Sequence, residues 1–151
     1  MPNANDFVIL AERDYTLCCK VEEDFPVEYA VTAACFHMQQ AIEKQLKALI
    51  MFCGETPEFT HNIAKLAKRC EELGIELPEM LDDIYDTLTM WESSSRNDPS
   101  IVFSEIKYSK AKNVYSDLKI QISNILSDSR CDDNNAGEIE DGESRGLQPT
   151  M

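Results

Sequence analysis

Several features that define other classes of protein are scarce in this sequence. It has only 5 Gly and 6 Pro among 151 residues, which excludes a collagen-like or Gly/Pro-rich low-complexity chain. No run of about eighteen apolar residues occurs, so we expect no membrane-spanning helix. The opening segment MPNANDFVIL lacks the positive stretch and long apolar core of a secretory signal. These absences predict a soluble, cytoplasmic protein.

Metal-binding patterns are also lacking. The chain has 2 His and 6 Cys, but no Cys-x-x-Cys pair and therefore no zinc-type spacing. Acidic pairs such as Glu71-Glu72 and Asp82-Asp83 suggest a ferritin-like metal site only if two helices supply Glu-x-x-His motifs, and the predicted helices do not. We expect reduced thiols, no metal and no cofactor.

Positive charge is scarce as well. The 28 acidic residues outnumber 14 Lys plus Arg, which gives a formal net charge of -14. No stripe of Lys and Arg is present, so the composition argues against general nucleic-acid binding but leaves a local basic pocket open. Residues 127–151 carry seven acids and two arginines and almost nothing to bury. We predict a folded domain over residues 1–126 and a disordered acidic tail over 127–151.

The spacing of apolar residues predicts helices throughout the folded part. Val27 to Cys53 contains no Gly or Pro, so one long helix is expected there. Its apolar residues recur every three or four positions and predict a buried face of Val31, Cys35, Met38, Ile42, Leu46, Leu49 and Phe52. The first helix is expected to bury Phe7, Leu10, Ala11, Leu17 and Cys18. We place the cap of a first helix at Asn5 or Asp6 and the caps of the later ones at Thr60 and Ser104. Pro26 and Pro78 are expected to open helices, and Gly54 and Gly74 to end them. No strand or internal repeat is evident. The predicted fold is an all-α, up-and-down four-helix bundle with an additional short helix.

The long helix and the loop after it carry a recognisable segment, AACFHMQQAIEKQLKALIMFCGETPEFTHNIAKL. This stretch resembles the signature of the HEPN superfamily, in which an aromatic-His-x-Gln-Gln-Ala-x-Glu-Lys-x-Leu-Lys-Ala helix is followed by Thr-His and a spaced Leu. The matching residues are Phe36, His37, Gln39, Gln40, Ala41, Glu43, Lys44, Leu46, Lys47, Ala48, Thr60, His61 and Leu66. Residues 11–14 and Ser95-Arg96 also fit the family's order, so the resemblance covers residues 7–126.

The resemblance implies a helical bundle that forms a homodimer. Some HEPN proteins are ribonucleases, including toxins of toxin–antitoxin pairs, and use an Arg followed by four to six residues and a His. Others accompany a minimal nucleotidyltransferase and are thought to help bind nucleotide or substrate. Here no His follows Arg96, Arg13 or Arg69 at that spacing, which removes the expected proton-transfer group. We expect a nucleotide-binding or partner-binding subunit that is not catalytic alone. The alternatives are an RNA-cleaving toxin and a non-catalytic interaction bundle.

Five residues are candidates for ligand or phosphate binding, and none is assigned a catalytic role. Arg96 lies at the predicted break before the last helix, where its guanidinium could hold a phosphate or instead cap helix carbonyls. His37, Gln40 and Lys44 share one side of the long helix and either form a polar pocket or bond to a neighbouring helix. His61, at a predicted helix N-terminus, either closes the loop or receives a phosphate there. We interpret Glu43 and Lys47 as a surface ion pair.

Overall fold

A computed structural model describes residues 2–94 and 104–139, without the side chains of residues 27–29, 93–94 and 129–139. Within those ranges it contains five helices and no strand: α1 (Ala4–Asp24), α2 (Val27–Phe52), α3 (Ile63–Glu72), α4 (Met80–Ser94) and α5 (Glu105–Ile139). The predicted all-α class is confirmed, with α3 as the additional short helix. In the described residues no helix is both long enough and apolar enough to cross a membrane.

The first helix begins earlier than expected. Its cap is Asn3 rather than Asn5 or Asp6: the Asn3 side chain accepts a hydrogen bond from the Asp6 amide, and the Asp6 carboxylate accepts one from the Asn3 amide, each at 2.9 Å. This reciprocal capping box satisfies two backbone donors at once, which favours Asn3 over its neighbours.

The second helix follows the prediction within one residue. Pro26 is the residue before the first helical position rather than the first position itself. Cys53 caps the other end, and Gly54 takes a φ of +83°, a left-handed conformation that glycine adopts without strain. With 26 residues, α2 is about 39 Å long.

Two further helix starts differ from the prediction. The cap of α3 is Asn62, whose side chain accepts from the Lys65 amide at 3.1 Å, while the Thr60 hydroxyl accepts from the Asn62 amide at 3.1 Å. Thr60 therefore orders the loop instead of capping the helix. Pro78 does not open α4, because that helix begins two residues later, at Met80. The Pro78 carbonyl accepts a hydrogen bond from the Leu81 amide at 3.1 Å, in the turn that leads into the helix. The predicted cap Ser104 is confirmed, because its hydroxyl accepts from the Lys107 amide at 3.2 Å.

The chain divides into two units, Met1–Lys119 and Ile120–Met151. Helix α5 continues through residues 127–139, which the composition had assigned to a disordered tail. No proline interrupts the helix in that stretch, so the backbone hydrogen bonds of α5 can continue despite the polar composition. Residues 140–151 of the predicted tail lie outside the described residues.

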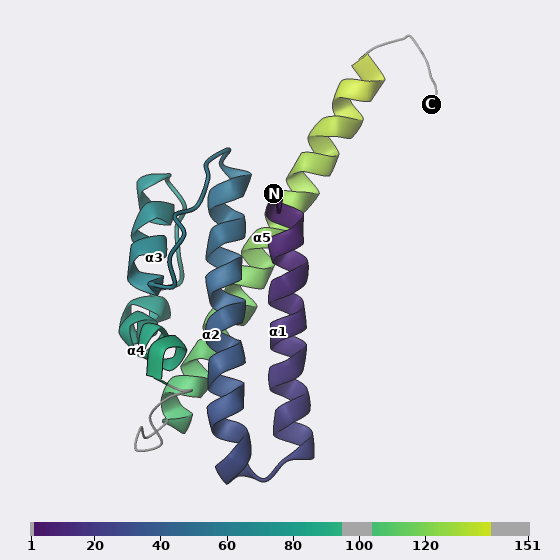
Figure 1. The fold of residues 1–151 in the computed structure, drawn as a ribbon. Coiled ribbons are helices and arrows are strands. Elements are labelled where there is room, and N and C mark those ends of the chain that lie inside the picture. Colours follow the sequence, from purple (N-terminus) through teal and green to yellow (C-terminus); the bar gives the residue numbers. More distant parts are fainter. Residues whose placement is uncertain (1, 95–103, 140–151) are drawn as a thin grey trace. The chain divides into compact units, whose positions relative to one another are not determined.

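The core of the first unit is built around α2. Helices α1 and α2 run antiparallel side by side, and α3 and α4 lie on the other side of α2 from α1 (Figure 1). Five of the seven predicted core positions of α2 are 0% exposed, namely Cys35, Met38, Ile42, Leu46 and Leu49. The other two, Val31 and Phe52, are half-buried. Burial of a large side chain such as Ile42 or Leu46 stabilises the fold by about 1.5–3 kcal/mol. Leu17, which we expected in the core, is 46% exposed.

The first part of α5 packs against this pair of helices through aromatic and backbone contacts. The rings of Tyr15 and Tyr115 stack with centroids 4.0 Å apart and an interplanar angle of 4°. The buried Gln45 side chain donates to the Tyr115 carbonyl at 3.0 Å. These contacts fix the position of α5 within the first unit.

Candidate functional site

A carboxylate of α1 holds two polar side chains of α2. His37 Nδ1 lies 3.0 Å from Asp14 Oδ1, and Lys44 Nζ donates to Asp14 Oδ2. His37 and Lys44 are seven residues apart, two helical turns, and therefore share the face that meets α1. The Asp14 side chain is 12% exposed, whereas those of His37 and Lys44 are 28% and 22% exposed. We call these three residues the Asp14 cluster; its carboxylate is buried and its two donors remain in partial contact with water.

A second carboxylate, Glu43, collects polar groups on a different side of α2. Lys47 Nζ lies 3.2 Å from Glu43 Oε2, and Gln39 Nε2 donates to Oε1 at 3.0 Å. His61 Nδ1 lies 2.9 Å from the same Oε1. The side chains of Glu43 and Lys47 are only 4% and 10% exposed. The expected surface ion pair is therefore wrong: it is buried, because the loop that carries His61 covers Glu43.

Gln40 belongs to this second group rather than to the first. Its amide nitrogen donates to Gln39 Oε1 at 2.7 Å, which links it through Gln39 to Glu43. Among the described residues no hydrogen bond joins Gln40 to His37 or Lys44. We call Gln39, Gln40, Glu43, Lys47 and His61 the Glu43 cluster. The predicted pocket of His37, Gln40 and Lys44 thus divides between two carboxylates.

His61 lies in the loop before α3, not within the first turn of the helix, since Asn62 is the cap. Its side chain is 53% exposed and its Nδ1 faces Glu43. Beside it, Phe59 is fully exposed, with its ring centroid 5.9 Å from Lys47 Nζ. The contact with Glu43 supports the interpretation in which His61 closes the loop onto α2, and it leaves the outer edge of the imidazole accessible.

Arg96, the fifth candidate, lies outside the described residues. Its predicted role in phosphate binding therefore stays a prediction. Trp91, on the helix that leads toward it, is 1% exposed, which agrees with packing in the core rather than stacking on a base.

Three of the cysteines, Cys18, Cys35 and Cys70, are buried in the core. Cys18, Cys19, Cys35, Cys53 and Cys70 are free, and the described residues contain no group of three His, Cys, Asp or Glu side chains placed to hold a metal ion. Burial raises the pKa of Cys18, Cys35 and Cys70 to about 12. These three thiols are therefore protonated at neutral pH and act as small apolar core residues.

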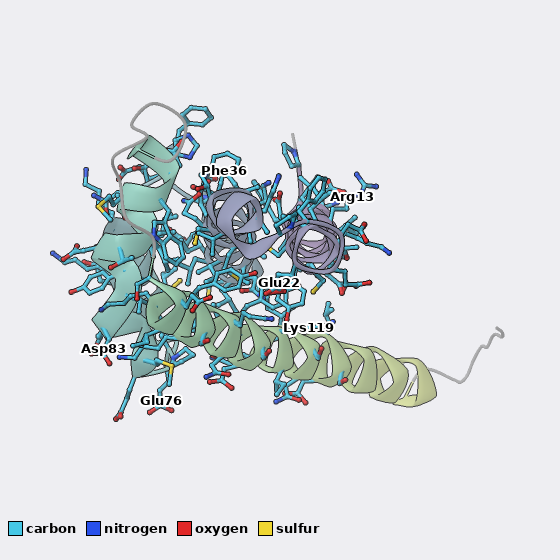
Figure 2. The ribbon with its side chains drawn as sticks, turned by 90° about the horizontal axis from the view of Figure 1, so that it is seen from below. Arg13, Glu22, Phe36, Glu76, Asp83 and Lys119 are labelled. Atoms are coloured by element: carbon cyan, nitrogen blue, oxygen red, sulfur yellow. The ribbon has the colours of Figure 1, made fainter. Side chains whose placement is uncertain are left out.

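Asp14 and Gln39 entered the sequence analysis only through the family resemblance, not as candidate site residues, and the burial of Glu43 was not predicted. Asp14 has one available signal: it lies three residues after the buried Ala11 on the core side of α1, where an isolated acid requires a partner. Figure 2 shows that Arg13, its neighbour, extends instead into solvent from the outer side of α1.

A comparison with family models matches residues 19–129 to the HEPN domain. Neither a curated protein nor a solved structure matches the chain. The matched segment contains α2, α3, α4, the first part of α5 and every member of both clusters except Asp14. Because the match covers well over half of the chain and agrees with the all-helical fold, this protein belongs to the HEPN domain family.

Proposed function

We propose that the chain is a dimeric nucleotide-binding subunit that works beside a minimal nucleotidyltransferase and does not itself cleave RNA. The Asp14 cluster carries this proposal. Lys44 and His37 are held by one buried carboxylate, so their partly exposed donors are already oriented when a ligand arrives. In a chain with a net charge of -14, an anionic ligand needs a local cationic donor such as Lys44.

A phosphate group is the ligand chemistry that these donors fit best. The Lys44 ammonium can form a charge-assisted hydrogen bond to a phosphate oxygen. Because His37 Nδ1 donates to Asp14, Nε2 on the accessible edge of the ring can accept from a ligand hydroxyl, or donate to a phosphate when the ring is protonated. The exposed fractions of 22% and 28% leave both groups within reach of a ligand. Arg96, outside the described residues, is proposed as a further phosphate contact.

The alternative of RNA cleavage has less support. Cleavage through the 2′-hydroxyl requires one group to take a proton and another to give one. The chain has two histidines, neither follows an arginine at the family's spacing, and both bind carboxylates. Incubation with transfer and messenger RNA tests this alternative: cleavage that depends on Arg96, lost in Arg96→Ala, would replace our proposal.

Thermal unfolding with a panel of nucleoside mono-, di- and triphosphates tests nucleotide binding. A ligand at 100 times its Kd stabilises the folded state by about 2.7 kcal/mol, which raises the Tm of a chain of this size by roughly 5–10 °C. We expect Lys44→Met to lose this shift. Lys119→Met is the matched control, because it removes an exposed lysine that pairs with Glu12 at 3.3 Å, away from the cluster. No shift with any nucleotide would contradict the proposal.

The dimer and the partner chain are proposed separately from the ligand. Ile9 and Leu17, on the outer side of α1, are 49% and 46% exposed and line a groove of about 570 Å³ with Arg13 and Thr16. Apolar side chains exposed together in this way are typical of protein contacts. Light scattering should give a dimer mass for the wild type and a lower mass for Leu17→Glu. If the wild type is a monomer and binds no nucleotide, both parts of the proposal are contradicted, and the interpretation that remains is a plain helical bundle.

A further inference from the structure

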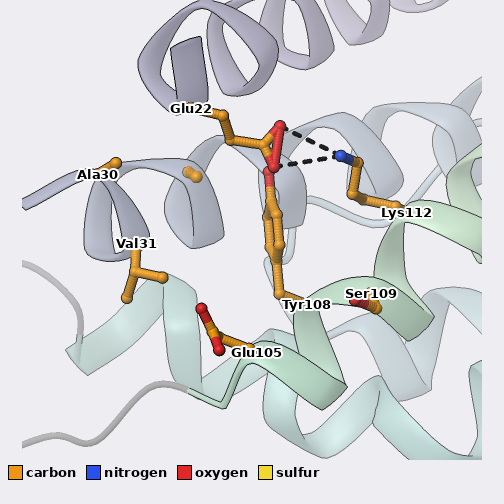
Figure 3. A pocket seen from close by; sticks show the side chains of 8 residues that line it. Glu22, Ala30, Val31, Glu105, Tyr108, Ser109 and Lys112 are labelled. Carbon is orange, nitrogen blue, oxygen red and sulfur yellow. Dashed lines mark hydrogen bonds and ion pairs between the residues drawn. The ribbon is translucent and has the colours of Figure 1, made fainter. Parts of the chain in front are cut away.

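Two sides of α1 are occupied within the first unit. Toward α2, Asp14 holds the two donors of the Asp14 cluster. Toward α5, Tyr15 stacks on Tyr115, and the two carboxylate oxygens of Glu22 lie 3.1 and 3.2 Å from Lys112 Nζ (Figure 3). Between residues 6 and 20 the third side carries six exposed residues, all within about 60° of Arg13 around the helix. We call this set the α1 outer face: Asp6, Ile9, Arg13, Thr16, Leu17 and Lys20.

The α1 outer face combines exposed apolar side chains with charges that lack partners. Ile9 and Leu17, 49% and 46% exposed, line the groove of about 570 Å³ together with Arg13 and Thr16. Among the described residues, the side chains of Arg13 and Lys20 make no hydrogen bond or ion pair. An exposed apolar patch bordered by charged residues is typical of a surface that contacts another protein.

The order of residues along the α1 outer face fits a second copy of the same helix. Ile9 and Leu17 each lie four residues from Arg13, about 6 Å along the axis, and Asp6 and Lys20 each lie seven residues away, about 10.5 Å. An antiparallel copy with Arg13 at the two-fold axis therefore brings Ile9 to the partner's Leu17, and Asp6 within reach of the partner's Lys20. A parallel copy would place each charged residue opposite itself, which is unfavourable.

We propose that a second copy of this chain docks antiparallel on the α1 outer face, centred on Arg13. This inference rests on the dimer of the proposed function and adds its surface and register. The apolar pairs supply the attraction near the middle, and the opposite charges of Asp6 and Lys20 fix the direction of the partner helix. At the axis Arg13 meets the partner's Arg13, and these like charges keep the association weaker than the other pairs alone would make it.

Charge reversal, followed by sedimentation equilibrium of the full chain, tests the register. Lys20→Asp creates two pairs of like charges across the interface, as does Asp6→Lys, so each variant alone should dimerise about tenfold more weakly than the wild type. An equimolar mixture of the two variants should regain the wild-type affinity as a heterodimer, because both end pairs then have opposite charges. Asp6→Lys also removes the carboxylate that accepts from the Asn3 amide, but the other variant could not repair a frayed helix end.

Lys65→Asp is the matched control. It makes the same change of charge at an exposed lysine of α3, which lies on the other side of α2 from α1 (Figure 1), and its dimer affinity should equal that of the wild type. Arg13→Leu should tighten the dimer several-fold, because it removes the like charges at the axis and joins the two apolar pairs.

The proposed register is overturned if the mixture dimerises as weakly as either variant alone, if Lys20→Asp dimerises as Lys65→Asp does, or if Arg13→Leu is no tighter than the wild type. A wild-type dimer that ignores Lys20→Asp uses another surface, which overturns this inference and leaves the dimer of the proposed function in place. A wild-type monomer contradicts that dimer itself. Nucleotide binding is tested at Lys44, outside the α1 outer face, and can fail independently.

Discussion

The buried pair of Glu43 and Lys47 offers the most direct test of how polar groups contribute to this fold. We consider Glu43→Gln, which keeps the shape of the side chain and removes its charge. At 3.2 Å, and with an effective dielectric constant of about 20, the direct attraction between the two charges is about 5 kcal/mol. Part of that attraction offsets the cost of removing both groups from water.

The expected loss of stability follows from what remains after the substitution. Lys47, 10% exposed, keeps its charge without a carboxylate partner, and unpaired buried charges cost about 3–5 kcal/mol. The new amide oxygen can still accept hydrogen bonds from Lys47 or Gln39, which recovers part of the loss. We therefore expect Glu43→Gln to lower the free energy of unfolding by about 2–3 kcal/mol, measured by urea unfolding followed by circular dichroism.

Glu12→Gln is the matched control for this measurement. Its pair with Lys119 has a similar length, 3.3 Å, but the two side chains are 49% and 57% exposed, so its loss should stay below about 0.5 kcal/mol. A double-mutant cycle with Lys47→Met should give a coupling energy of at least about 1 kcal/mol. If Glu43→Gln costs no more than Glu12→Gln, water reaches Glu43 and the reasoning from burial is refuted.

Three further predictions concern the core and its thiols. Leu46→Ala, at a position that is 0% exposed, should lower the free energy of unfolding by about 2–5 kcal/mol through lost burial and a cavity; a loss below about 1 kcal/mol in urea unfolding would contradict the packing of α2. In a Cys131→Ser background, a thiol reagent at neutral pH should label the exposed Cys53 quickly, and should label Cys18, Cys35 and Cys70 only when the chain unfolds. Mass spectrometry measures the labelling, and rapid labelling of all three buried thiols would contradict their burial. Burial raises the pKa of these three thiols from 9.0 to about 12. As the pH rises, the thiols of the unfolded chain therefore lose their protons before those of the folded chain, which favours unfolding. Between pH 9 and 12 each thiol should lower the free energy of unfolding by about 1.4 kcal/mol per pH unit. Unfolding measured across that range should show a shallower pH dependence for Cys35→Ala, and an unchanged slope would exclude this origin.

The helices could be predicted from sequence because their signals are local. The range of α2 was correct within one residue, since only Gly54 and the proline before Val27 interrupt a long stretch without helix breakers. The caps were harder to predict. Asn3, Asn5 and Asp6 all have side chains suitable for capping, and the choice depends on the residue at which the backbone departs from helical geometry, which is Asn3. Leu17 was misplaced because an apolar residue at helical spacing does not reveal how wide the buried face is.

The candidate site was predictable only as far as one helix determines it. The spacing of His37 and Lys44 correctly placed them on one face of α2, but their partner Asp14 comes from α1, so its identity depends on the register between two helices. Glu43 and Lys47 were assigned to the surface because an i,i+4 pair has the same pattern whether or not a loop covers it. The loop that brings His61 onto Glu43 supplies this information, and its path is a tertiary property.

The two clusters differ in which of their members a ligand can reach, and that difference separates stability from binding. Glu43 and Lys47 are only 4% and 10% exposed, so a ligand has little access to them. Buried ion pairs can often be replaced together by apolar residues of similar size without loss of stability. Lys44, 22% exposed, is accessible to a phosphate that competes with Asp14. A double variant, Glu43→Met with Lys47→Leu, should therefore stay folded and keep the nucleotide-induced rise in Tm that Lys44→Met loses. Loss of that rise in the double variant, with its circular dichroism unchanged, would assign nucleotide binding to the Glu43 cluster instead of the Asp14 cluster.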